Sequence, residues 1–189
     1  KVYSNPEHGE PFKEVDSLGG HDPYSASKAC SEIVSESYRR AYFYEQGSPV
    51  LATARAGNVI GGGDWAADRI VPDCIRALDA GVGIRVRNPN AVRPWQHVLE
   101  PLFGYLSLAC RLGEDQSLAR AWNFGPLPED VHTVGELVEA VVAGWGGGEW
   151  MTPYSEEEPP EAQILRLDIS DATSILDWHP RWDFATAVD

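Results

Sequence analysis

The feature that most constrains the fold of this chain is a long helical pattern that ends at a glycine and leads directly into an apolar strand. Residues 24–46 repeat apolar side chains at helical spacing, and Gly47 ends the pattern. Residues 49–54 are typical of a buried strand, which continues through residues 55–60 into three glycines at 61–63. This order of elements predicts an open α/β sheet: a helix, a tight connection, a strand, and a flexible loop at the carboxyl end of the strand. Such sheets bind ligands at that edge.

Size and charge restrict the class of protein. The 189 residues can make one domain, or a domain with an added lobe, and 43% of them are hydrophobic, enough for a core. The net charge of −14 argues against nucleic acid as the main partner, because phosphate backbones need a basic surface. A small phosphorylated ligand needs only a few local arginines, so it stays compatible with this charge.

The sequence gives no sign of a membrane, a leader or a metal site. No apolar run approaches the ~18 residues of a membrane span, and residues 1–13 hold no apolar signal-peptide core. The three cysteines, at 30, 74 and 110, lack metal-ligand spacing. We therefore expect reduced, buried or half-buried thiols in a cytoplasmic protein.

Further elements follow from periodicity and end signals. Ile33, Val34 and Tyr38 are expected on the inner face of the first helix. Thr133 and Glu136 have capping-box spacing at the start of a later helix. We also expect helices at 69–80, 98–112, 133–143 and 170–176, strands at 83–86, 121–125 and 165–168, and a loop at 145–160.

Tyr24 and Lys28 form a Tyr-x-x-x-Lys pair at the head of the first helix, just after Asp22-Pro23, a cap residue followed by a first-turn proline. Residues four apart share one helical face. A lysine charge beside a phenol favours the phenolate, which can take a proton from an alcohol while a hydride leaves the same carbon. By itself the pair is a weak motif, and the alternative is a surface tyrosine on an amphipathic helix.

Seven segments, spread in order over nearly the whole chain, give the pair a context. The chain resembles the sugar-nucleotide branch of the extended short-chain dehydrogenases, the epimerase/dehydratase family, and most closely the enzymes that dehydrate CDP-glucose. Two runs are specific to these enzymes: Gly-Gly-Gly-Asp-Trp at 61–65 and Arg-Pro-Trp-Gln-His-Val-Leu-Glu-Pro at 93–101. The matching segments are residues 1–3, 19–28, 55–65, 68–73, 93–102, 122–126 and 178–182.

The resemblance implies the last part of a Rossmann-like parallel sheet with a smaller mixed α/β lobe. Residues 1–60 are expected in the NAD-binding domain, and residues 61–189 mainly in a nucleotide-sugar-binding lobe, with segments interleaved. The family begins with Gly-x-x-Gly-x-x-Gly for the NAD pyrophosphate, and this sequence has no such motif. We therefore expect a C-terminal portion of the enzyme that is not competent alone.

The resemblance also assigns the chemistry. Tyr24 is expected to take the proton of the sugar 4-hydroxyl as NAD⁺ receives the hydride from C4. Lys28 is expected to favour the phenolate and to bind the nicotinamide ribose. Water is then lost across C5 and C6, and the hydride returns to C6. The family's acid for the 6-hydroxyl precedes the position of Lys1, whose own role stays open between catalysis and closing a strand.

Four residues are predicted to bind the sugar nucleotide. Arg69 and Arg93 are expected at the diphosphate, since guanidinium groups fork onto phosphate oxygens. Asn58 is expected at the ligand, with a turn cap as its alternative. Asn123 is expected either at the nucleotide or at the turn before Gly125.

Five aromatic and histidine residues are given mainly structural roles. Trp95 is expected to pack, with base stacking as the alternative, and His97 to cap a helix or lie in the core, with an acid role as the alternative. Trp178, His179 and Trp182 are expected to pack the small lobe.

The resemblance implies a CDP-sugar substrate, NAD, a homodimer through the Tyr24 helix, and a place in O-antigen synthesis. The alternatives are a nucleotide-sugar 4-epimerase, a dehydratase for another nucleotide sugar, and a non-catalytic nucleotide-sugar-binding lobe.

Overall fold

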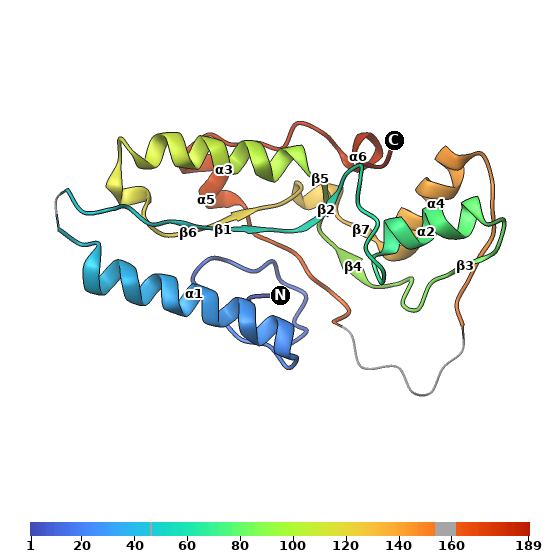
Figure 1. The fold of residues 1–189 in the computed structure, drawn as a ribbon, viewed down its shortest axis with the longest axis horizontal. Helices are drawn as coiled ribbons and strands as arrows, with labels where there is room; N and C mark the ends of the chain where they lie inside the picture. Colours follow the sequence, from blue (N-terminus) through green and yellow to red (C-terminus); the bar gives the residue numbers. More distant parts are fainter. Residues whose placement is uncertain (46, 154–161) are drawn as a thin grey trace.

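The computed structural model describes residues 1–45, 47–153 and 162–189, and Figure 1 shows the fold. The helices are α1 (Pro23–Tyr42), α2 (Ile70–Asp79), α3 (Leu99–Leu112), α4 (Val134–Trp145), α5 (Ser170–Leu176) and α6 (Phe184–Val188), with 3₁₀ turns at Gln116–Leu118 and Pro128–Asp130. The strands are β1 (Thr53–Ala56), β2 (Asn58–Ile60), β3 (Ile84–Arg85), β4 (Val92–Arg93), β5 (Trp95–His97), β6 (Ala121–Phe124), β7 (His132–Thr133) and β8 (Trp150–Met151).

One half of the molecule is built on the parallel pair β1–β6, in which Thr53 lies opposite Ala121 and Ala56 opposite Phe124. In Figure 1, α1 lies on one side of this pair, and α3 and α5 lie on the other. Helices on both faces of parallel strands are the arrangement of a doubly wound α/β sheet. The predicted fold class is confirmed.

Three short strand pairs lead into the other half. β2–β5 and β3–β8 are parallel, and β4–β7 is antiparallel. They connect β1–β6 to α2 and α4, at the right of Figure 1, and to α6, which contacts β5 and α4. β2 follows β1 after a single residue, Gly57. A Cβ there would lie 2.5 Å from the carbonyl oxygen of Pro94, so only glycine fits this close crossing.

Two hydrophobic cores correspond to the two halves. The first lies under α3 and α5 and comprises Leu108, Leu118, Trp122, Phe124, Ile169, Ala172, Leu176 and Trp178. The second lies between α2, α4 and α6 and includes Ile60, Cys74, Leu78, Ile84, Val86, Trp95, Leu137, Val138, Val141, Phe184 and Ala187. Trp178 therefore packs under α3 and not in the small lobe, which corrects the expectation for this residue.

The predicted helix starts agree with the structure, whereas one helix end and two predicted segments near the C-terminus differ from it. α4 begins with the predicted capping box, in which the Thr133 hydroxyl accepts from the Glu136 N–H and the Glu136 carboxylate accepts from the Thr133 N–H. α1 ends at Tyr42, before the predicted end. Within residues 165–168, Leu167 forms an isolated bridge with Phe12, and no named strand forms. The predicted loop at 145–160 contains β8, and its residues 154–160 lie outside the described residues.

The predicted inner face of α1 is exposed. Ile33, Val34 and Tyr38 are 56%, 54% and 50% exposed, whereas Ser25 and Ala29 are the buried residues of this helix. The expectation of buried or half-buried cysteines also fails for two residues, because Cys30 and Cys110 are exposed. No helix among the described residues is both long and apolar enough to cross a membrane.

Candidate active site

The start of α1 holds the Tyr-Lys pair in a fixed place. The Asp22 carboxylate caps the helix by accepting from the Ser25 N–H (2.9 Å) and the Ser25 hydroxyl (2.6 Å). These hydrogen bonds from Ser25 lower the pKa of Asp22. Gly20 lies so close that a Cβ there would be 2.1 Å from the Ser25 Cβ. Asp22 and Gly20 thus fix where the helix begins, and Pro23 occupies its first turn.

Tyr24 and Lys28 lie together on the outer surface of this first turn. The Tyr24 side chain is 55% exposed, and the Lys28 ammonium is 5.4 Å from the centroid of its ring. The two side chains therefore share one helical face, as their spacing predicts. Lys1 extends toward the same helix start, with its Nζ 3.9 Å from the Asp22 carboxylate. A fixed, accessible phenol with an ammonium beside it is suited to proton transfer with a bound alcohol.

Behind this surface lies a buried polar network that sequence reasoning missed. The Arg55 guanidinium donates to the Tyr3 hydroxyl (2.8 Å) and pairs with the Glu32 carboxylate (2.8 Å). Burial opposes the charge of Arg55, but its hydrogen bonds to Glu32 and Tyr3 outweigh burial and raise its pKa. Burial raises the pKa of Tyr3 to about 12, so this phenol stays protonated. Through Glu32 and Arg55, the network ties α1 to β1. An arginine inside an otherwise apolar strand was the available signal, since a buried charge needs a partner.

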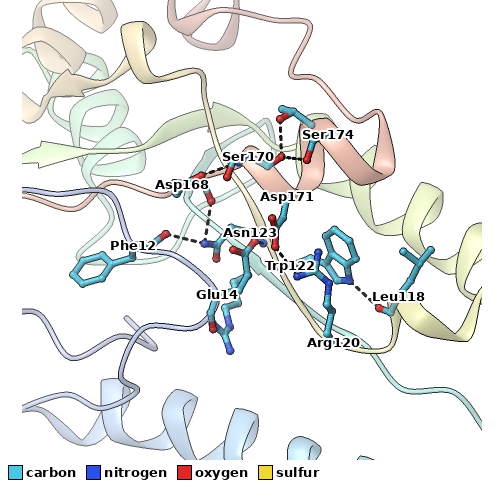
Figure 2. A network of polar contacts seen from close by, with 12 residues as sticks. Phe12, Glu14, Leu118, Arg120, Trp122, Asn123, Asp168, Ser170, Asp171 and Ser174 are labelled. Atoms are coloured by element: carbon cyan, nitrogen blue, oxygen red, sulfur yellow. Dashed lines mark hydrogen bonds and ion pairs between the residues drawn. The ribbon is translucent and has the colours of Figure 1, made fainter.

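Asn123 connects this network to the next strand, as Figure 2 shows in part. Its side-chain oxygen accepts from the Tyr3 hydroxyl (2.6 Å), and its amide donates to the carbonyls of Phe12 (2.9 Å) and Asp168 (3.1 Å). Its backbone N–H donates to the Glu14 carboxylate (2.7 Å). Asn123 is fully buried, and these bonds use both of its amide hydrogens. These bonds hold chain segments together, and the alternative of a contact with nucleotide stays a prediction.

The other predicted substrate residues lie on or next to the short strands. Asn58 is exposed on β2 and lies opposite Trp95 of β5, so it neighbours the segment that contains Arg93. Arg93 is buried on β4, where its guanidinium donates to the carbonyl of Val92 (2.9 Å). Arg69 is exposed at the N-terminus of α2. The structure thus places Asn58 on β2, which pairs with β5, and Arg93 on β4, two residues before β5 in the sequence. Arg69 lies separately, at the start of the helix that follows the glycine loop.

The structural roles predicted for two other residues are confirmed. Trp95 is 4% exposed in the core. His97 accepts the Leu99 N–H at the start of α3 through Nδ1 (3.2 Å). A hollow of about 230 Å³ lies between residues 127–130 and 180–183 and contains none of the predicted site residues. Among the described residues, no group of three or more acidic, histidine or cysteine side chains could hold a metal ion.

Comparison with known proteins decides which family this arrangement resembles. A CDP-glucose 4,6-dehydratase from Salmonella typhimurium is 47% identical over 187 residues, which are 96% of this chain and 52% of the relative. The chain is a homologue of the C-terminal part of that dehydratase. It spans about half the length of the curated relatives it matches. No protein-family model matches the chain.

Solved structures share the fold. DesIV, a dTDP-glucose 4,6-dehydratase from Streptomyces venezuelae with NAD and TYD bound, has a TM-score of 0.79 at 19% identity, over 95% of this chain and 52% of that protein. A UDP-glucuronic acid 4-epimerase from Bacillus cereus, in complex with UDP-glucuronic acid and NAD, has a TM-score of 0.80 at 15% identity, over 99% of this chain and 56% of that protein. The predicted resemblance and fold class are therefore both confirmed.

Proposed function

We propose that this chain supplies the Tyr-Lys pair and the nucleotide-sugar side of an NAD-dependent 4,6-dehydratase acting on CDP-glucose. The observation that carries the proposal is the 47% identity, over 96% of the chain, to a CDP-glucose 4,6-dehydratase. The accessible pair Tyr24 and Lys28 supports it, because a catalytic phenol must reach its substrate. The two relatives described above whose structures contain NAD support the choice of cofactor.

The residues present fit one end of this cofactor. An exposed ammonium and phenol on one helical face match the hydroxyl groups of a nicotinamide ribose and of a sugar. The glycine-rich turn that would hold the pyrophosphate is not in this sequence. When bound, the nicotinamide would accept a hydride from the sugar and return it. We accordingly propose that the chain alone does not turn over CDP-glucose.

The proposed roles follow from charge and position. Tyr24 takes the proton of the sugar 4-hydroxyl, and Lys28 stabilises the phenolate and orients the ribose. Arg69, which is exposed at a helix N-terminus, and Arg93 contact the diphosphate. Asn58 contacts the sugar nucleotide from the exposed side of β2.

We further propose a homodimer formed through α1. Ile33, Val34 and Tyr38 expose apolar surface on this helix, and a second copy of the helix would cover it. We also propose a cytoplasmic enzyme whose 4-keto-6-deoxy product enters lipopolysaccharide O-antigen synthesis. These statements rest on the resemblance.

A nucleotide-sugar 4-epimerase is the second candidate. The observation that favours it is the likeness to the UDP-glucuronic acid 4-epimerase, which has the same fold over 99% of this chain. Both reactions need a phenol that removes the 4-hydroxyl proton, so the position of Tyr24 does not separate them.

A chimera separates the candidates. This chain would replace the matching part of the Salmonella typhimurium relative, and the protein would be incubated with CDP-, dTDP-, GDP- and UDP-glucose. We expect a 4-keto-6-deoxy product from CDP-glucose at least about tenfold faster than from the others, since tenfold corresponds to ~1.4 kcal/mol of discrimination. Tyr24→Phe should lower that rate at least about 100-fold. Galactose formation from UDP-glucose would favour the epimerase, and an active Tyr24→Phe chimera would remove Tyr24 from its role.

A further inference from the structure

The loop before α1 contains a glutamate that holds a distant segment of the chain. The Glu7 carboxylate accepts the backbone N–H groups of Gln163 (3.2 Å) and Ile164 (3.4 Å), which lie 156 and 157 positions later in the sequence. The Asn5 amide donates to the carbonyl of Ile164 (3.1 Å) and to the Glu7 carboxylate (3.2 Å). We call these contacts the Glu7 clasp. Because its acceptor is a carboxylate, the clasp is stronger than hydrogen bonds between neutral groups.

Glu7 makes this contact from an unusual backbone conformation. Its φ is 59°, in the left-handed region that residues other than glycine, asparagine and aspartate rarely adopt. The Asn5 side-chain oxygen accepts the Glu7 N–H (2.9 Å) and closes the turn. A glutamate kept in a conformation that glycine adopts without strain indicates a role for its side chain.

Gln163 connects the clasp to Arg93 through a single residue. The N–H of Gln163 is bound by Glu7, and its carbonyl accepts from the Val92 N–H (2.7 Å) and from the Arg93 guanidinium (3.4 Å). The Leu165 N–H donates in turn to the Val92 carbonyl (3.1 Å). Residues 163–165 therefore lie along β4, and Glu7 ties them to the loop before α1.

The same loop leads to the start of α1. Residues 2–4 pair with residues 17–19 through backbone hydrogen bonds of 2.8 and 2.9 Å, just before the N-cap of α1. The Glu7 clasp thus connects the segment that begins the Tyr24 helix with the strand that carries Arg93.

We propose that Glu7 is a positioning residue that holds Arg93 in place for the diphosphate of a substrate whose sugar lies at Tyr24. This inference rests on the proposed function, in which one substrate reaches both side chains. Glu7 acts through Gln163. Its loss loosens Arg93, and ordering a loose side chain at the moment of binding costs affinity. Tyr24 is held by the cap of α1 and keeps its chemistry.

A purely structural clasp is the alternative, and the far end of the loop separates the two roles. The Phe12 N–H donates to the Arg166 carbonyl (3.0 Å), and the Asp168 N–H donates to the Phe12 carbonyl (2.9 Å). These bonds hold the loop without Glu7. Loss of the Glu7 carboxylate should therefore free the segment next to Arg93 and leave its Asp168 end in place.

Hydrogen exchange in this chain tests the connection without any reaction. Glu7→Gly removes the carboxylate and keeps the turn, because glycine adopts a positive φ freely. We expect the N–H groups of Gln163 and Val92 to exchange at least about tenfold faster, and that of Asp168 at an unchanged rate. Glu10→Ala is the matched control and should change none of these rates, because Glu10 is exposed on the same loop and its carboxylate makes none of these bonds. Unchanged exchange at Val92, or faster exchange at Asp168 as well, would overturn the proposal.

Kinetics of the chimera with the Salmonella typhimurium relative test the effect on the substrate. Glu7→Gly should raise KM for CDP-glucose about five- to tenfold and change kcat less than about twofold, since it weakens binding without touching proton transfer. The dissociation constant of CDP, measured by calorimetry, should rise by the same factor, and Glu10→Ala should change neither constant. A lower kcat at constant KM, as expected if the variant only reduces the folded fraction, would overturn the proposal.

The two readouts separate the clasp from the function on which it rests. A chimera that binds CDP but forms no dehydrated product would contradict the proposed function, and the CDP affinity and the exchange of the Val92 N–H would still decide the role of Glu7. A chimera that does not bind CDP would overturn both proposals.

Discussion

Arg55 is the central residue of the buried polar network, because it bonds both Glu32 and Tyr3. Its side chain is 7% exposed and that of its partner Glu32 is 11% exposed, so both charges are largely removed from water. Thr53 also donates to the same Glu32 oxygen, at 2.7 Å. A buried ion pair adds little net stability, but one partner left without the other is costly.

Glu32→Ala should therefore lower the free energy of unfolding by roughly 3–5 kcal/mol, because it leaves the Arg55 guanidinium buried without its carboxylate. Urea unfolding of the chain measures this loss. The double variant Glu32→Ala/Arg55→Leu is the control and should be markedly more stable than Glu32→Ala alone. If the two variants unfold at the same urea concentration, the ion pair does not have the role assigned to it.

Glu14 makes a prediction about pH. Burial raises its pKa above the ordinary 4.5. A carboxyl whose folded pKa is raised favours folding most below its unfolded pKa, and that contribution is lost as pH rises through the folded value. Glu14→Gln keeps an oxygen acceptor for the Asn123 N–H and removes the titration. The stability of this variant relative to the original chain should therefore increase between pH 4 and pH 7. A relative stability that stays flat over this range would contradict the role of Glu14.

At the scale of elements, local signals predicted helix starts well. Asp22 and Pro23 mark the first turn of α1. Thr133 and Glu136 mark the first turn of α4, and the structure has the caps at these residues. β8 was missed because its two residues pair with β3, more than sixty positions earlier, and carry no periodic pattern of their own. The exposed face of α1 was assigned to the core because periodicity shows that a face is apolar but not what covers it.

Gly104 tests how tightly α3 packs on β6. In an isolated helix, glycine to alanine stabilises by roughly 1 kcal/mol. A Cβ at Gly104 would lie 2.5 Å from ring atoms of Phe124 and 3.1 Å from the Trp178 Nε1, so Gly104→Ala should instead lower the melting temperature. Gly144 on α4 is the matched control, because nothing lies within 4 Å of its added Cβ, and Gly144→Ala should raise the melting temperature by a few degrees. Stabilisation by Gly104→Ala would show that α3 sits farther from β6.

At the scale of the whole molecule, the two cores do not follow the order of the sequence. α3, β6 and α5 come after residue 61, yet they build the core next to β1, on the side of β1–β6 opposite α1. The division at residue 60 itself stays a prediction. The closeness of Tyr24 and Lys28 was predictable from their spacing because one helix carries both. The network of Tyr3, Arg55 and Asn123 was not found, since its members come together only through the sheet.

We propose that this chain belongs to an enzyme that moves one hydride within one CDP-sugar. The most direct measurement follows deuterium from CDP-glucose labelled at C4 through the chimera with the Salmonella typhimurium relative. This proposal predicts a 4-keto-6-deoxy product with deuterium at C6, no accumulation of reduced nicotinamide, and product formation at least about 100-fold slower with Tyr24→Phe. Deuterium retained at C4, deuterium found on released nicotinamide, or turnover that survives Tyr24→Phe would contradict it.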